Sequence, residues 1–282
     1  MSTWLRHRRW EQCRTGGSIG ARAAGFARNL AGSLAAAIGF SCLAGALSLS
    51  PSVAEAQQRR AFLVATDSYE HLRNSSLGME AFRKIAEGLR RNGFEVAEAL
   101  DDRSSVIRAK FARFARRVRD DDVVLFILAG HMLSTDRGAL YLPREIEVRE
   151  DADVFRRAIS LRTFMNAASR GGSGLVLMLS TNPELATQSS QLSPYPTNIA
   201  PPPGNVVVAF SSSRGVPVSR IDYSANKALE RLVRVMSGPM TDGNQLAEAV
   251  AGDDTGTIFG GASSMRLSPE AGSGRRTAGP AT

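Results

Sequence analysis

Two residues of this 282-residue chain have side chains and a spacing suited to acyl-transfer chemistry. His131 directly follows the segment Phe126–Gly130, which is apolar. Thr181 lies 50 residues later and directly follows the segment Leu175–Ser180, which is apolar except for its last residue. An imidazole can act as general base, and a hydroxyl of Ser180 or Thr181 beside it could act as nucleophile. Such a pair works only where two separate segments bring the side chains together.

The segments around these residues alternate between strand-like and helix-like patterns. Fully apolar runs separated by amphipathic segments are typical of strands that are buried on both faces of a parallel sheet. We therefore predict an α/β three-layer sandwich, with a mostly parallel sheet of about six strands and helices on both faces. The predicted strands are 61–65, 94–98, 123–128, 175–179 and 206–210, and the predicted helices are 79–89, 107–118, 161–165 and 225–236.

Local signals predict where some of these elements begin and end. Ser160 is expected to cap the helix at 161–165, and Ser104 or Ser105 the helix at 107–118. Residues 194–204 contain five prolines and are expected to form a loop. If the runs before His131 and Thr181 are neighbouring parallel strands, the two side chains should lie within about 10 Å of each other.

The first 56 residues have the composition of a targeting segment. Six arginines precede an uncharged stretch rich in Ala, Leu and Gly, and Ala54-Glu55-Ala56 resembles a cleavage site. We predict a signal peptide at 1–56, a domain at 57–252, a flexible Gly-, Ser- and Thr-rich tail at 253–282, and a periplasmic or secreted location. The alternative is an uncleaved leader, through which alone the protein would contact a membrane.

Charge and cysteine content exclude several kinds of function. Without the leader the chain has 29 basic and 25 acidic residues, so the net charge falls from +8 to +4 and no nucleic-acid partner is expected. The basic residues at 108–119 are interpreted as one solvated helix face. Both cysteines, Cys13 and Cys42, lie in the leader, so the mature chain would have no thiol nucleophile and no disulfide.

At several points the chain resembles bacterial caspase-like peptidases, the metacaspase and paracaspase relatives. The 50-residue separation matches the spacing of about 50 residues between the catalytic His and Cys in caspases. The resemblance covers roughly residues 60–215 and rests on six segments in the order of the family: Arg60–Tyr69, Phe126–His131, Leu140–Pro143, Ala158–Leu161, Leu175–Asn182 and Asn205–Ser212.

The chain departs from the family pattern at the positions that would carry the chemistry. Thr181 stands where the family has its catalytic cysteine, and Leu179 where it has an aspartate that helps to bind a basic substrate residue. Met132 and Asn182 replace a glycine and an arginine. The resemblance implies catalytic positions at His131 and Thr181 and substrate-binding positions at Leu179 and Asp67. It also suggests that, if His131 points into the cleft, Leu179→Asp combined with Thr181→Cys would restore more activity than either change alone.

Three interpretations of His131 remain open: a remnant of a lost active site, a base for Ser180 or Thr181, and a contact for a ligand or partner. We expect an exported caspase-like protein that is catalytically inactive and binds a peptide or protein partner. The alternative is an active hydrolase. No cofactor is expected. With two histidines and no cysteine after residue 56, a zinc site is not expected, and turns explain Asp101-Asp102 and Asp120–Asp122 without calcium.

Overall fold

The computed structural model describes residues 57–185, 191–196, 199–240, 242–252 and 255–260. The predicted signal peptide at 1–56 and most of the predicted tail lie outside these residues. No helix in the described ranges has the length and apolar character needed to cross a membrane.

One sheet organises the described part of the chain. Its main path has the order β2-β1-β3-β6-β7-β8, and all neighbours are parallel except β7 and β8. Two short strands, β4 and β5, extend the end of β3 in antiparallel pairing. The strands are β1 (Arg59–Ala65), β2 (Phe94–Leu100), β3 (Val123–Thr135), β4 (Gly138–Tyr141), β5 (Ile159–Ser160), β6 (Ser173–Thr181), β7 (Val206–Phe210) and β8 (Thr257–Phe259).

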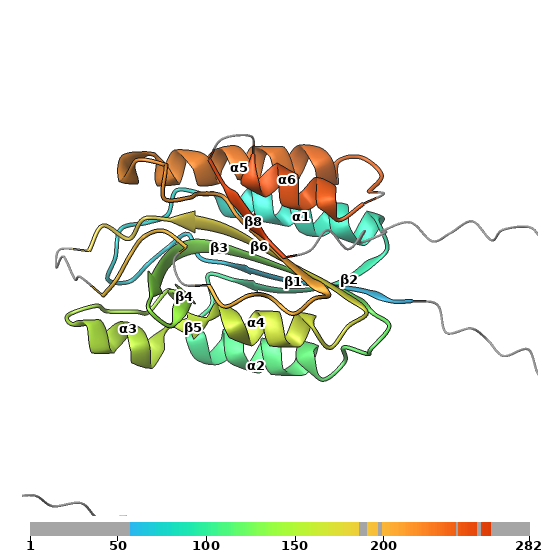
Figure 1. The fold of residues 1–282 in the computed structure, drawn as a ribbon, viewed down its shortest axis with the longest axis horizontal. Coiled ribbons are helices and arrows are strands. Elements are labelled where there is room, and N and C mark those ends of the chain that lie inside the picture. The colour runs from blue at the N-terminus through green and yellow to red at the C-terminus, as the bar shows by residue number, and fades with distance from the viewer. Residues whose placement is uncertain (1–56, 186–190, 197–198, 241, 253–254, 261–282) are drawn as a thin grey trace, which may run out of the picture. The chain divides into compact units, whose positions relative to one another are not determined.

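Helices cover both faces of this sheet, as Figure 1 shows. On one side lie α1 (Met79–Arg91), α5 (Ile221–Met236) and α6 (Asn244–Ala251). On the other lie α2 (Ser104–Ala115) and α4 (Leu161–Ala168), while α3 (Asp151–Arg157) lies near the β4–β5 end. A short 3-10 helix, Val218–Arg220, precedes α5. The predicted three-layer α/β sandwich is confirmed.

The alternation of side chains along the central strands divides the core into two parts. Leu175, Leu177 and Leu179 of β6 pack on the α1–α5 side, whereas Val176 and Met178 pack on the α2–α4 side. β3 alternates in the same way, and all thirteen of its residues are buried. Because successive side chains of a strand point to opposite faces, Thr181 continues the α1–α5 series and Ser180 the other.

The predicted strands and helices are present, with some differences at their ends. Ser160 caps α4 as predicted, because its Oγ accepts a hydrogen bond from the backbone N–H of Arg162. The predicted cap by Ser104 or Ser105 is wrong. Ser104 is the first residue of α2, and its backbone N–H and hydroxyl donate to the carboxylate of Glu145, which takes the place of a cap.

The structure also contains elements that the sequence did not predict: α3, α6, β4, β5 and β8. β8 lies inside the segment predicted to be a flexible tail, so that prediction is wrong for residues 257–259. This short strand pairs antiparallel with β7 and forms the edge of the sheet.

Candidate functional site

His131 and Thr181 meet at the carboxyl ends of β3 and β6. The two residues are register partners in the parallel ladder, and Thr181 Oγ1 lies 2.8 Å from His131 Nδ1. The prediction that these side chains lie close together is confirmed. Both are almost completely buried, with exposures of 0% for His131 and 1% for Thr181.

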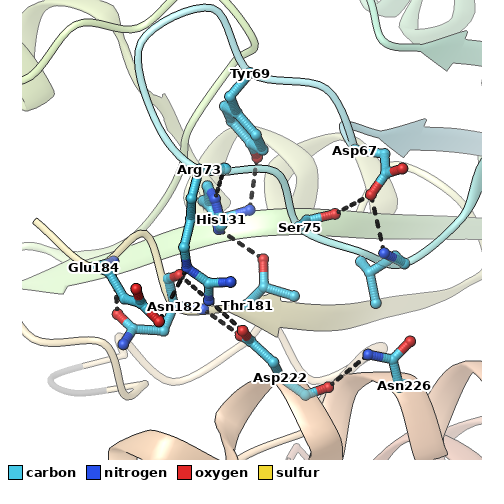
Figure 2. A network of polar contacts seen from close by, with 11 residues as sticks. Asp67, Tyr69, Arg73, Ser75, His131, Thr181, Asn182, Glu184, Asp222 and Asn226 are labelled. Atoms are coloured by element: carbon cyan, nitrogen blue, oxygen red, sulfur yellow. Dashed lines mark hydrogen bonds and ion pairs between the residues drawn. The ribbon is translucent and has the colours of Figure 1, made fainter.

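The partners of the imidazole define its tautomer. His131 Nε2 lies 2.7 Å from the backbone carbonyl oxygen of Arg73. A carbonyl oxygen can only accept a hydrogen bond, so Nε2 carries the proton. Nδ1 is then free to accept the hydroxyl proton of Thr181 when the imidazole is neutral. Figure 2 shows the imidazole between these two partners.

The surroundings favour the neutral imidazole. Burial lowers the pKa of His131 from its usual 6.5 to about 4, and the nearby Arg73 guanidinium lowers it as well. The hydrogen bond to the Arg73 carbonyl and the charge of Asp222 oppose this effect. His131 is therefore uncharged near pH 7, but a base of such low pKa accepts a proton from a hydroxyl only weakly.

Tyr69 covers one face of the imidazole. The two rings stack with centroids 4.2 Å apart and planes inclined by 24°. The Tyr69 hydroxyl accepts the backbone N–H of His131 at 2.7 Å and lies 3.3 Å from the carbonyl oxygen of Leu142, to which it donates. Burial raises the pKa of Tyr69 well above its usual value, so the hydroxyl remains protonated and able to donate.

Gly130 makes this close approach possible. Its φ is 137°, and a Cβ at this position would lie 2.7 Å from the Tyr69 hydroxyl oxygen and 2.9 Å from the Thr66 carbonyl oxygen. No larger residue fits without displacing one of them. The glycine before His131 is thus explained by the packing of Tyr69 and Thr66 against the end of β3.

Ser180 is not positioned to work with His131. Its Oγ lies 3.0 Å from Ser212 Oγ, and its backbone N–H donates to Ser211 Oγ at 3.2 Å. The Ser180 side chain points to the face of the sheet opposite to His131, as the alternation along β6 requires. Of the two hydroxyl residues proposed as nucleophiles, the structure brings only Thr181 to the imidazole.

Leu179 is part of the hydrophobic core. It is the register partner of Ala129, has no exposed surface, and packs in the cluster between the sheet and the α1–α5 layer. The expectation that Leu179 lines a substrate pocket does not hold in this structure, because the residue lies one pleat below Thr181 and inside the domain.

Asp67 shapes the loop that follows β1. Its Oδ1 accepts hydrogen bonds from the Ser75 hydroxyl at 2.9 Å and the Leu77 backbone N–H at 3.0 Å, and its own carbonyl accepts the Ser75 N–H. The side chain is partly exposed. In this structure Asp67 closes the loop on itself, and a contact with substrate remains a prediction.

Three residues that the sequence analysis did not single out complete the site together with Asn182: Arg73, Glu184 and Asp222. The Arg73 guanidinium forms an ion pair with Asp222 and donates to the Asn182 carbonyl at 2.5 Å. Asp222, in the first turn of α5, also accepts the Asn182 backbone N–H at 2.8 Å. Arg73 and Asp222 are 149 positions apart, and no motif or periodicity relates them.

Both acidic runs considered for calcium contain carboxylates with protein partners. Asp101 Oδ1 accepts the backbone N–H groups of Asp67 and Ser68, Asp102 pairs with Lys110, and Asp122 pairs with Arg60. Among the described residues no group of three or more His, Cys, Asp or Glu side chains could hold a metal ion. These carboxylates thus contribute to the structure of turns and ion pairs.

Comparison with known proteins finds similarity in three-dimensional structure. No protein-family model matches the sequence, and no curated protein matches it. One solved structure with a similar fold is a caspase. It is the Drosophila initiator caspase Dronc, with 9% sequence identity, a TM-score of 0.48, and coverage of 72% of this chain and 79% of that chain. This likeness concerns the fold; the chemistry of the site follows from the contacts described above.

Proposed function

We propose that this chain is a caspase-like protein, related to the metacaspases, that does not cleave peptides and that binds a peptide or protein partner. In this proposal Thr181 occupies the position of the family's catalytic cysteine. The observation that carries it is the buried hydrogen bond between Thr181 Oγ1 and the neutral imidazole of His131. Both groups are closed to solvent, so a substrate does not reach them in this structure.

The chemistry of the two side chains supports the absence of peptidase activity. A cysteine is an effective nucleophile because its thiol, with a pKa of about 8.5, ionises near neutral pH. A threonine hydroxyl must instead lose its proton to a base during the attack. Because the pKa of His131 is lowered to about 4, the imidazole is a poor acceptor for that proton.

The topology supports a place for the proposed partner. Ligands of open parallel sheets bind outside the carboxyl ends of the strands, where His131 and Thr181 lie. A nucleic-acid partner is not part of the proposal, because Lys110 and Arg117 of the basic segment pair with Asp102 and Glu95. The proposed partner is a peptide or a protein.

A second candidate function is hydrolysis with Thr181 as nucleophile. It is favoured by the order of groups in the site: a hydroxyl, an imidazole and a carbonyl oxygen that orients the imidazole. Hydrolases that use a hydroxyl nucleophile arrange their nucleophile, base and orienting group in this order. The two candidates differ in whether the wild-type protein turns over substrate.

Turnover of fluorogenic peptides by purified residues 57–282 tests the proposal. We expect no cleavage of peptides with Arg, Lys or Asp before the scissile bond, and none after Thr181→Cys alone, because the pair is closed to solvent. Thr181→Ala and His131→Ala are the matched controls. Wild-type turnover that disappears in both controls would replace the proposal with the hydrolase.

Export through the 1–56 leader is also part of the proposal. It rests on the basic and then uncharged composition of the leader and on Ala54-Glu55-Ala56 before Gln57. N-terminal sequencing of the protein from the cell envelope is expected to begin at Gln57. Recovery of the intact chain in membranes would favour an uncleaved anchor instead.

A further inference from the structure

The loop between β1 and α1 lies against the His131–Thr181 pair. We refer to residues 66–78 as the covering loop. Tyr69 of this loop stacks on the imidazole, and the Arg73 carbonyl accepts its Nε2 proton at 2.7 Å. Figure 2 shows both residues reaching the pair from the loop. The loop thus covers the groups that a partner would need to contact.

Arg73 joins the covering loop to two other parts of the chain. Its guanidinium pairs with Asp222 of α5, donates to the Asn182 carbonyl at 2.5 Å, and lies 3.2 Å from Glu184 Oε1. Asn182 directly follows β6, so one side chain connects the loop to both the strand end and the helix start (Figure 2).

This connection is accessible to solvent, unlike the pair beneath it. The side chains of Arg73 and Asp222 are 28% and 29% exposed, and that of Glu184 is 64% exposed. Arg73 Nε has no hydrogen-bond acceptor in suitable geometry, despite its distance of 3.2 Å from Glu184. Partly exposed ion pairs are worth little free energy, so a competing charge can break this one.

The two ends of the covering loop are held independently of Arg73. Asp101 Oδ1 accepts the N–H groups of Asp67 and Ser68 at the start, and Asp67 binds Ser75 and Leu77 at the end. Tyr69 and Glu70 are held as well, by the contacts of the Tyr69 hydroxyl and by the hydrogen bond from the Glu70 N–H to the Arg144 carbonyl. Releasing Arg73 would therefore free only the part of the loop around residue 73, which covers His131 Nε2, and leave the other attachments in place.

We infer that Arg73 is a positioning residue that holds the covering loop over the His131–Thr181 pair, and that a partner reaches the pair only after the Arg73–Asp222 ion pair is broken. The inference rests on the proposed function in one respect, that the pair is the site a partner contacts. Beyond the proposed function, it states that the Arg73–Asp222 ion pair controls the access of the partner to His131 and Thr181.

Chemical labelling of histidines tests the inference without an activity assay. Residues 57–282 are treated with diethyl pyrocarbonate at pH 7, and mass spectrometry measures the modification of His131. His71 is exposed in the same loop and serves as internal reference. Because reaction requires local opening, we expect His131 to react about tenfold faster, relative to His71, in Arg73→Ala than in wild type.

Arg103→Ala is the matched control. Arg103 donates to Glu70 of the covering loop at 2.9 and 3.1 Å but does not contact the pair, so the variant should label like wild type. Asp222→Asn, which keeps an oxygen for the Asn182 N–H but loses the charge, should label faster than wild type and decides the matter if Arg73→Ala does not fold. Circular dichroism checks the fold of each variant.

Equal labelling of His131 in wild type, Asp222→Asn and folded Arg73→Ala would overturn the inference, and so would an equal rise in Arg103→Ala. Either result leaves the turnover experiment unaffected. Conversely, peptide turnover by the wild type would contradict the proposed function without changing the labelling rates.

Discussion

Leu179→Asp is expected to unfold the domain. Leu179 has no exposed surface and packs in the core between the sheet and the α1–α5 layer. The substitution removes a buried leucine and introduces a carboxylate with no hydrogen-bond or ion-pair partner. We expect it to lower the free energy of unfolding by about 5 kcal/mol or more. Because a domain is stable by only about 5–15 kcal/mol, little of that margin would remain. Urea unfolding followed by circular dichroism measures the loss.

Val106→Asp provides the control for this substitution. Val106 is 39% exposed and lies in the first turn of α2, where a carboxylate is favourable, so its stability should stay within about 0.5 kcal/mol of wild type. The loss of stability expected for Leu179→Asp would also reduce any activity that Leu179→Asp combined with Thr181→Cys restores, and the effect of the double change on activity stays a prediction. A Leu179→Asp protein with wild-type stability would show that residue 179 borders an open pocket.

The stability of the domain should fall as His131 is forced to accept a proton. Its pKa is lowered to about 4 in the folded state from the usual 6.5, so the unfolded chain binds the proton more tightly. The neutral His131 therefore makes its full contribution to the free energy of unfolding above pH 6.5. This contribution is lost as the pH falls towards 4. The difference in pKa corresponds to about 3 kcal/mol.

A comparison with His131→Gln isolates this contribution. The variant has no titratable group at residue 131, whereas the carboxylates of the chain titrate in both proteins. The difference in unfolding free energy between wild type and variant should shrink by about 3 kcal/mol from pH 7 to pH 4. A difference that stays constant over this range would show that His131 keeps an ordinary pKa.

The sequence predicts the parts of the site that depend on strand periodicity. His131 and Thr181 each follow a continuous apolar run, and parallel strands place such ends side by side. The same periodicity places Leu179 on the face of Thr181. It does not tell whether a residue one pleat below the strand end borders a cleft or the core, so the error at Leu179 arose there.

Features formed by loops and strand edges escaped prediction for a different reason. Arg73 and Asp222 meet because the covering loop folds over the end of the sheet. No sequence pattern relates these two positions. β8 lies in a Gly- and Thr-rich segment of low apolar content and forms only through its pairing with β7. Tertiary contacts decide both, and a local pattern does not record them.

The central claim is that His131 is a buried neutral imidazole that donates through Nε2 to Arg73 and accepts from Thr181 through Nδ1. Nitrogen-15 NMR of histidine-labelled protein over pH 4 to 8 measures the tautomer and the pKa directly. We predict a His131 ring protonated at Nε2, with a pKa of about 4. A ring that titrates near 6.5, or that carries its proton on Nδ1 at neutral pH, would contradict the account.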